Sequence, residues 1–186
     1  MKRIASVFLC IFVLCGCNKT DNIMDKLLSF RQKLIQSNRS SFECTVTADY
    51  GDQVYSFTLL CDFDQKGNMR FSVLEPESIS GVTGTVDSNG GNLTFDDKIL
   101  GFPLLADGYL TPVSAPWLLM KTLRSGYIES WGELKDGWLI SLYDSYEENT
   151  MQVDIISDPE MNPVSAEFIW DGRRILSLTV SDFSYL

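Results

Sequence analysis

The chain has 186 residues, a formal net charge of −10 and no histidine. This length fits one domain, and a hydrophobic fraction of 45% is typical of a globular protein, which excludes disorder over most of the chain. The lack of histidine excludes His-based triads, Cys–His dyads and His-ligated zinc sites. Because 25 acidic side chains outnumber 15 basic ones, no nucleic acid partner and no basic membrane-docking patch are expected.

Residues 1–17 have the pattern of an export signal. Lys2 and Arg3 precede an apolar run, Ile4–Leu14, which covers about 16 Å as a helix, about half of a bilayer core. The run is therefore a secretion signal and not a membrane span. The following Leu14-Cys15-Gly16-Cys17 resembles the bacterial lipobox, in which Leu at −3 and a small residue at −1 precede an acylated cysteine. We expect cleavage directly before Cys17 and lipidation of that residue.

This processing places the mature protein on the extracytoplasmic face of the cell membrane. Residues 1–16 are the signal peptide, residues 17–22 the lipidated cysteine and a short tether, and residues 23–186 a single domain. Two or three acyl chains on Cys17 anchor a protein stably, whereas one chain is marginal. Loss of the two basic residues of the signal takes the net charge from −10 to about −12. The alternatives are an ordinary cleaved signal or a buried N-terminal helix.

The mature chain begins with a predicted amphipathic helix over residues 21–37, where apolar residues recur at helical spacing. A β-hairpin follows, because apolar residues fall on even numbers over residues 42–50 and on odd numbers over residues 55–63. Cys44 and Cys61 lie on the apolar faces of these two strands.

We expect a disulfide between Cys44 and Cys61, because they are an even pair in an oxidising compartment once Cys17 is lipidated. Pairing of Tyr50 with Tyr55 sets the two cysteines directly opposite each other, whereas a two-residue Gly51-Asp52 turn makes them diagonal neighbours. The alternative is a pair of buried thiols that act as small hydrophobic side chains.

A second helix is predicted over residues 115–124, with Ser114 as its N-cap and Gly126 just beyond its end. This helix is apolar over most of its circumference, so most of its surface must be covered. No linker or repeat divides the chain. The remaining strands are predicted over residues 69–74, 81–87, 92–95, 98–105, 127–134, 138–143, 150–156, 164–170 and 173–183.

These elements predict an α+β fold, mostly antiparallel, in which a curved half-barrel sheet holds the N-terminal helix and the short apolar helix in its concavity. The lipobox at Cys17, the amphipathic first helix and a strand that ends in Glu75-Pro76 resemble the LolA/LolB-type lipoprotein-carrier superfamily, including Gram-positive sporulation and germination lipoproteins. The resemblance implies an open half-barrel with the helices as a lid. It assigns no ligand-binding residue, because the Glu75-Pro76 match is structural.

The most apolar part of the mature chain contains the candidate ligand-binding residues Phe102, Leu104, Trp117 and Met120. They could line or gate a cavity for a lipid chain. They could equally fill the half-barrel as core, which is the more common use of an apolar stripe.

Two acidic segments are weaker candidates. Asp144, Glu147 and Glu148 form the densest acidic cluster, which we interpret as an exposed loop, with a cation or a basic partner as the functional alternative. Residues 62–67 begin like a calcium loop, but Lys66 occupies a ligand position, so a hairpin turn is predicted there. No metal site and no cofactor are expected.

The sequence thus predicts a monomeric, non-enzymatic lipoprotein that binds a protein or an envelope component. The alternative is a carrier or sensor of a hydrophobic ligand held in the half-barrel. A hydrolase is a third class, but the chain has neither a Gly-x-Ser-x-Gly nor a Ser-x-x-Lys motif. A continuous cavity between the sheet and the second helix would favour the carrier, and a filled interior with an exposed apolar patch would favour the binding module.

Overall fold

The computed structural model describes residues 20–49, 53–106, 109–146 and 150–186, so the predicted signal and Cys17 lie outside the described residues. It contains the helices α2 (Thr20–Gln36) and α3 (Ala115–Ser125) and the 3-10 turns η1 (Glu77–Ile79) and η2 (Pro112–Ser114). A short ladder joins β7 (Leu105–Ala106) to β8 (Tyr109–Leu110). The large sheet contains β1 (Arg39–Asp49), β2 (Val54–Asp64), β3 (Met69–Glu75), β4 (Thr83–Asp87), β5 (Gly90–Phe95), β6 (Lys98–Phe102), β9 (Tyr127–Leu134), β10 (Gly137–Tyr143), β11 (Gln152–Ser157), β12 (Pro163–Trp170) and β13 (Arg173–Tyr185).

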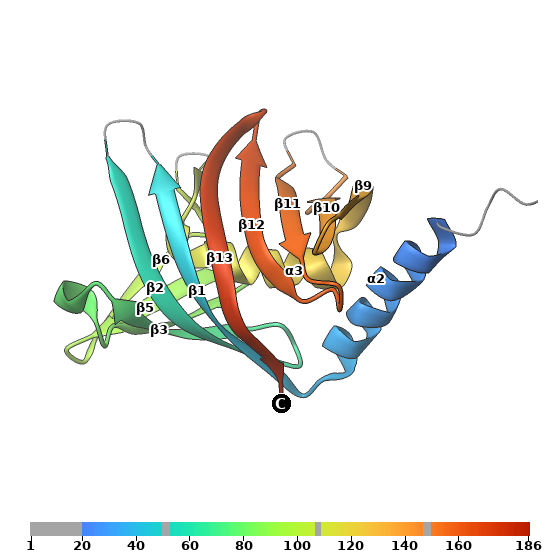
Figure 1. The fold of residues 1–186 in the computed structure, drawn as a ribbon. Helices are drawn as coiled ribbons and strands as arrows, with labels where there is room; N and C mark the ends of the chain where they lie inside the picture. The colour runs from blue at the N-terminus through green and yellow to red at the C-terminus, as the bar shows by residue number, and fades with distance from the viewer. Residues whose placement is uncertain (1–19, 50–52, 107–108, 147–149) are drawn as a thin grey trace, which may run out of the picture.

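The 11 strands of the large sheet are antiparallel and follow the order β6-β5-β4-β3-β2-β1-β13-β12-β11-β10-β9. Figure 1 shows the sheet curving around α3, which lies behind β1, β13 and β12 in this view, with α2 to one side. The predicted α+β half-barrel with an apolar helix in its concavity is confirmed.

β1 lies in the middle of the sheet because it pairs with β2 on one side and with β13, the last strand, on the other. Buried Phe42, Cys44, Val46 and Ala48 alternate along β1 with exposed or half-buried residues. The sequence predicts this alternation, but it does not predict the pairing with β13. That pairing brings the two ends of the domain together into one continuous core.

One predicted strand is divided in two. The sequence predicts a strand over residues 98–105, but β6 ends at Phe102 and the chain then enters the separate β7–β8 ladder. Pro103 explains the break, since proline has no backbone N–H to give to a sheet. The other predicted strands and both predicted helices are present with small shifts of their ends.

The core lies between the inner face of the sheet and the two helices. From α3 it takes Trp117, Leu118, Leu119, Met120 and Leu123, and from α2 it takes Leu27, Phe30 and Leu34. The sheet contributes alternating large side chains, including Phe42, Leu59, Phe63, Phe71, Ile140, Val153, Phe168 and Leu178. α3 is therefore covered over most of its circumference, as its composition requires.

Arg31 of α2 fixes the C-terminal end of α3. Its Nη2 atom donates to the carbonyl oxygen of Gly126 at 2.6 Å and to that of Thr122 at 3.4 Å. The last carbonyls of a helix have no partners within the helix, and a cation there also interacts favourably with the helix dipole. Burial lowers the pKa of Arg31 from its ordinary value. Arg31 therefore ties the two helices together.

The start of α3 departs from the sequence prediction. Ser114 occupies the N-cap position but makes no side-chain cap hydrogen bond, and its buried hydroxyl has no hydrogen-bond partner among the described residues. The backbone of Ser114 is helical, because η2 runs directly into α3. An N-cap side chain normally needs an extended backbone to reach the following N–H groups, so the predicted cap does not form.

Gly84 of β4 provides a test of the packing beneath the sheet. A Cβ atom at this position would lie 2.3 Å from the backbone oxygen of Asn92 and 2.6 Å from Cζ of Phe71. We expect Gly84→Ala to lower the free energy of unfolding by about 1–3 kcal/mol, because the backbone of β5 would have to move. Urea denaturation of the purified domain measures this change.

Gly132→Ala on β9 is the matched control, because a Cβ atom there meets nothing within 4 Å. Equal stability of the two variants would contradict the close approach of β4, β5 and Phe71.

Candidate binding surface

The four residues predicted to bind a ligand lie together in the concavity, where they pack as core. Trp117 and Met120 of α3 are buried, with exposed fractions of 7% and 1%, and Phe102 and Leu104 pack half-buried against the same cluster. The Nε1 atom of Trp117 donates to the carbonyl oxygen of Gly67 at 3.1 Å, which fixes the indole. Contact of these residues with a lipid chain would require α3 to leave its place.

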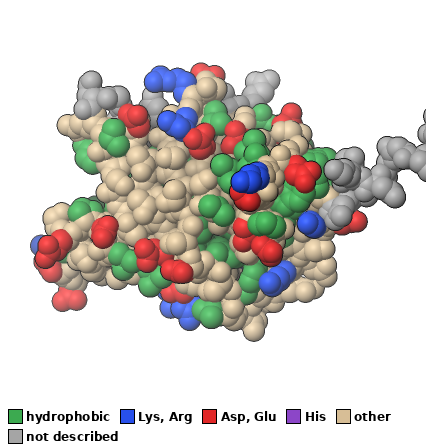
Figure 2. Space-filling view, viewed as in Figure 1, with side chains coloured by type: hydrophobic (Ala, Val, Ile, Leu, Met, Phe, Trp, Pro, Cys, Tyr) green, Lys and Arg blue, Asp and Glu red, His purple; other side chains and the backbone are tan. Residues whose placement is uncertain are grey.

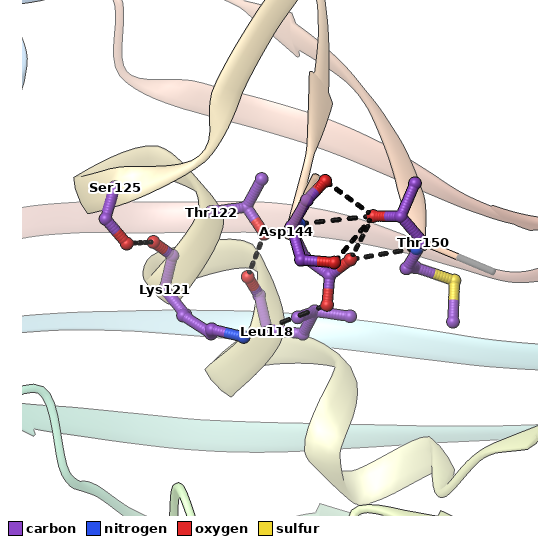
Figure 3. Close-up of polar contacts among 8 residues, drawn as sticks. Leu118, Lys121, Thr122, Ser125, Asp144 and Thr150 are labelled. Carbon is purple, nitrogen blue, oxygen red and sulfur yellow. Dashed lines mark hydrogen bonds and ion pairs between the residues drawn. The ribbon is translucent and has the colours of Figure 1, made fainter. Parts of the chain in front are cut away.

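Asp144, the first residue after β10, has a structural role (Figure 3). Its carboxylate accepts hydrogen bonds from the Thr150 hydroxyl at 2.7 Å and from the Met151 N–H at 2.8 Å, and Lys121 of α3 lies 3.7 Å away. Asp144 therefore holds α3 to the loop before β11 and is less exposed than the sequence predicts. Glu147 and Glu148 lie outside the described residues.

Cys44 and Cys61 are diagonal neighbours on β1 and β2. Cys44 faces Leu59 in the ladder, and the last pair before the turn is Asp49 with Val54. Cys61 in turn faces Phe42, so the direct pairing of the cysteines considered from the sequence is wrong. The turn residues 50–52 lie outside the described residues. The two Sγ atoms lie 3.9 Å apart as free, buried thiols, and no disulfide is seen. Burial, with a smaller effect of Cys44, raises the pKa of Cys61 well above its ordinary value.

With the concavity filled, surface hollows are found on the other side of the sheet. One has a volume of 580 Å³ and lies over β2 to β6. The side chains that alternate away from the core on these strands form its wall: Leu60, Asp62, Arg70, Ser72, Thr83, Thr85, Asn92, Thr94 and Ile99. We call these nine residues the outer hollow.

Smaller hollows adjoin it. One of 500 Å³ lies between β1, β2 and η1 and is lined by Thr45, Thr58 and Glu75 among others. Another of 410 Å³ shares Asp62, Arg70 and Thr85 with the outer hollow. None of these hollows, nor one of 260 Å³ beside Tyr143, is lined by the four predicted ligand-binding residues.

The outer hollow has few charged side chains, and these lie at the edge that it shares with the hollow of 410 Å³. Asp62 forms an ion pair with Arg39 at 3.0 Å, and the exposed Arg70 stands beside it. Burial acts to raise the pKa of Asp64 in the adjoining hollow, but hydrogen bonds, chiefly those donated by Asn68, outweigh it and lower the pKa. This edge therefore carries both signs of charge.

Figure 2 shows the same face in space-filling form, with a broad area over β1 and β2 that is neither charged nor apolar. Serine and threonine occupy many of the outward positions there, including Thr45, Thr47, Ser56 and Thr58. Hydroxyl groups both donate and accept hydrogen bonds, so this surface suits the polar rim of an interface.

The chemistry of the outer hollow favours binding over catalysis. A serine or threonine hydroxyl needs an adjacent base to act as a nucleophile, and Asp62 is already paired with Arg39. Within the described residues, no group of three or more Cys, Asp or Glu side chains could hold a metal ion. No helix in the described ranges is long and apolar enough to cross a membrane.

Sequence reasoning did not identify the outer hollow. Its signal is present as an alternation of polar and apolar residues, for example Arg70 and Ser72 between the buried residues of β3. These residues form one wall only because β2 to β6 are neighbours in sequence order, and the hollow depends on the curvature of the sheet.

Comparison with known proteins finds no matching family model and no matching curated protein. Among solved structures, an uncharacterized conserved protein from Thermus thermophilus is 14% identical, with a TM-score of 0.47, over 91% of this chain and 88% of that chain. A LolA superfamily protein from Nitrosomonas europaea is 11% identical, with a TM-score of 0.47, over 86% and 93% of the two chains. A chain in the complex of the CwlD amidase with the GerS lipoprotein from Clostridioides difficile is 13% identical, with a TM-score of 0.45, over 92% and 98%. A LolA superfamily protein and a complex that contains a lipoprotein are thus among the structural neighbours.

We expect Cys44 and Cys61 to be bridged in protein exported from a living cell. The thiols are close enough to join with small side-chain rotations, and oxidation by a thiol oxidoreductase of the envelope removes one hydrogen from each. Mass spectrometry of the denatured, unreduced protein would show a mass lower by two hydrogen atoms than the reduced form. Cys44→Ala, which cannot form the bridge, is the control, and a full-thiol mass for the exported wild-type protein would contradict the prediction.

Proposed function

We propose that this protein is a membrane-anchored extracytoplasmic lipoprotein whose domain binds a protein or another component of the cell envelope through the outer face of its sheet. The observation that carries the proposal is the filled concavity: Leu119 and Met120 of α3 have exposed fractions of 0% and 1%. Binding of a ligand inside would require removal of this helix, whereas the outer hollow is open as it stands.

The outer hollow has the composition of a protein-binding surface. Its volume of 580 Å³ lies within the range of about 300–1,000 Å³ found for ligand pockets. Leu60 on β2 and Ile99 on β6 give it apolar contact points at its two sides, with exposed fractions of 41% and 73%, and hydroxyl and amide side chains of β3 to β5 lie between them. Protein interfaces combine apolar contacts with hydrogen-bonding groups in this way.

One observation supports a second function, the carrier of a hydrophobic ligand. α3 carries buried apolar side chains on most sides, so a movement of α3 away from the sheet would open a space lined by the apolar core side chains that α3 now covers. This function needs an open state of the domain, whereas the binding module does not.

Site-specific photocrosslinking of the full-length lipoprotein in intact cells tests the proposal. A benzophenone amino acid at Thr83, in the outer hollow, should form an adduct, whereas the same group at Ile156 on β11 should not. Both positions are exposed, so the contrast isolates the hollow. Equal labelling at the two positions would contradict the proposed surface. A lipid found by native mass spectrometry of the purified protein would instead establish the carrier.

The anchor is tested separately. We expect Cys17→Ser to move the protein from the membrane fraction to the soluble extracytoplasmic fraction, because the acyl chains could no longer be attached. Cys15→Ser is the matched control and should leave the protein in the membrane, since Leu14 occupies the −1 position for Cys15. Detergent phase partitioning followed by immunoblotting measures both. Membrane retention of the Cys17→Ser variant would contradict lipidation at that position.

A further inference from the structure

β6 is one of the two terminal strands of the large sheet, and its side chains are unusually exposed for their type. It pairs with β5 only. Ile99 points to the outer face and Leu100 to the opposite face, with exposed fractions of 73% and 67%, and Phe95 at the turn before the strand is 55% exposed. An apolar edge strand that is open on both faces is a template for a further strand.

The other terminal strand is protected in a way that β6 is not. β9 carries exposed Glu129 and Glu133, and charged side chains are a common device against edge-to-edge pairing. Of its apolar residues, Ile128 and Trp131 are half-buried, and Leu134 at its end is 40% exposed. β9 therefore carries two charged side chains and less exposed apolar surface than β6, whose one charged residue is Lys98.

The register identifies the backbone groups that a partner would meet. The β5–β6 hairpin has a two-residue turn and closes at Phe95 paired with Lys98. In a two-residue hairpin the pair next to the turn, here Phe95 with Lys98, is hydrogen-bonded. Bonded and non-bonded pairs alternate along an antiparallel ladder, so Leu100 and Phe102 are also hydrogen-bonded to β5. The N–H and C=O groups of Ile99 and Gly101 therefore face away from β5, toward the open edge.

Charge around the edge specifies the occupant. Asp96 and Asp97 form the turn at one end of β6, and Asp87, the last residue of β4, lies two strands away toward its other end; the only basic residue of β6 itself is Lys98. This arrangement is complemented by an extended segment in which apolar and polar residues alternate at the centre and basic residues lie at both ends. A second copy of β6 does not, because antiparallel pairing would bring the acids of one copy near those of the other.

We propose that an extended segment of a partner protein, with basic residues flanking an apolar-alternating centre, adds to the sheet as a strand along β6. Its backbone bonds to Ile99 and Gly101, and its side chains pack against Ile99 on one face and Leu100 on the other. Because Ile99 also lines the outer hollow, the added strand extends that wall. The inference rests on the proposed binding function and names the chemistry of its partner.

Gly101 allows the backbone contact to be tested without changing the apolar side chains. A Cβ atom there has its nearest neighbour at 3.5 Å, which is ordinary van der Waals contact, so Gly101→Ala should fold normally. Gly101→Pro removes the outward N–H but no hydrogen bond to β5, and proline is tolerated at edge positions of this kind. The two variants therefore differ in whether residue 101 has a backbone N–H to donate at the open edge.

The probe is a fluorescent, end-capped peptide with lysines flanking alternating valine and threonine, titrated by anisotropy into the purified full-length domain. We expect Gly101→Ala to bind like the wild-type protein and Gly101→Pro to bind at least about fivefold more weakly, the effect of one lost hydrogen bond. The same peptide with alternate backbone amides methylated should not bind. NMR shifts of amides 98–102 would locate the complex, and equal urea midpoints would show that both variants are folded.

Equal binding by the proline and alanine variants would overturn edge addition, as would binding of the methylated peptide, or no binding of the peptide at all. A glutamate-flanked peptide that binds as well would overturn the proposed basic partner. A dimer that forms with increasing concentration and is lost in Gly101→Pro would assign the edge to a second copy. Crosslinking from Thr83 is independent of these results, so the proposed function can fail or stand separately.

Discussion

The packing of α3 inside the curved sheet is the constraint on which the rest of the structure depends. The outer face of the 11-stranded antiparallel sheet is in contact with water, so the apolar side chains of the strands gather on the inner, concave face. We call this concave apolar face the trough. α3 fills that trough with Leu119, Met120 and Leu123. Arg31 from α2 holds its C-terminal end, and Arg124 donates to the Gln65 carbonyl at 2.7 Å in the β2–β3 turn.

A filled trough changes where binding can take place. A half-barrel with an empty interior offers its concave face to a ligand, whereas here the inner side chains are committed to α3. In the proposed function the outward positions, which are rich in hydroxyl groups, form the surface for recognition. Hydrophobic burial then uses one face of each strand and the proposed recognition the other, because side chains alternate along a strand.

The elements were predictable because each is a local pattern. The alternation in β1 and β2, the helical spacing in α2 and the apolar α3 can each be identified within about ten residues of sequence. The pairing of β1 with β13 was not predictable, since no local pattern links strands that far apart. The outer hollow and the open edge of β6 depend on this strand order and on curvature. Individual residues of both surfaces could be named from the sequence, but not their assembly into one site.

The unequal packing of the sheet supports the proposed use of β4 to β6 for binding. Across residues 83–102, all of which the structure describes, Val86 is the only large apolar side chain that is fully buried. β1, β2 and β13, by contrast, line the core along much of their length. The end strands are thus held mainly by their own hydrogen-bond ladder, and segments of low burial are those that open most readily. A strand added to β6 would supply the second neighbour that this edge lacks, so binding there would stabilise the least buried part of the fold without disturbing α3.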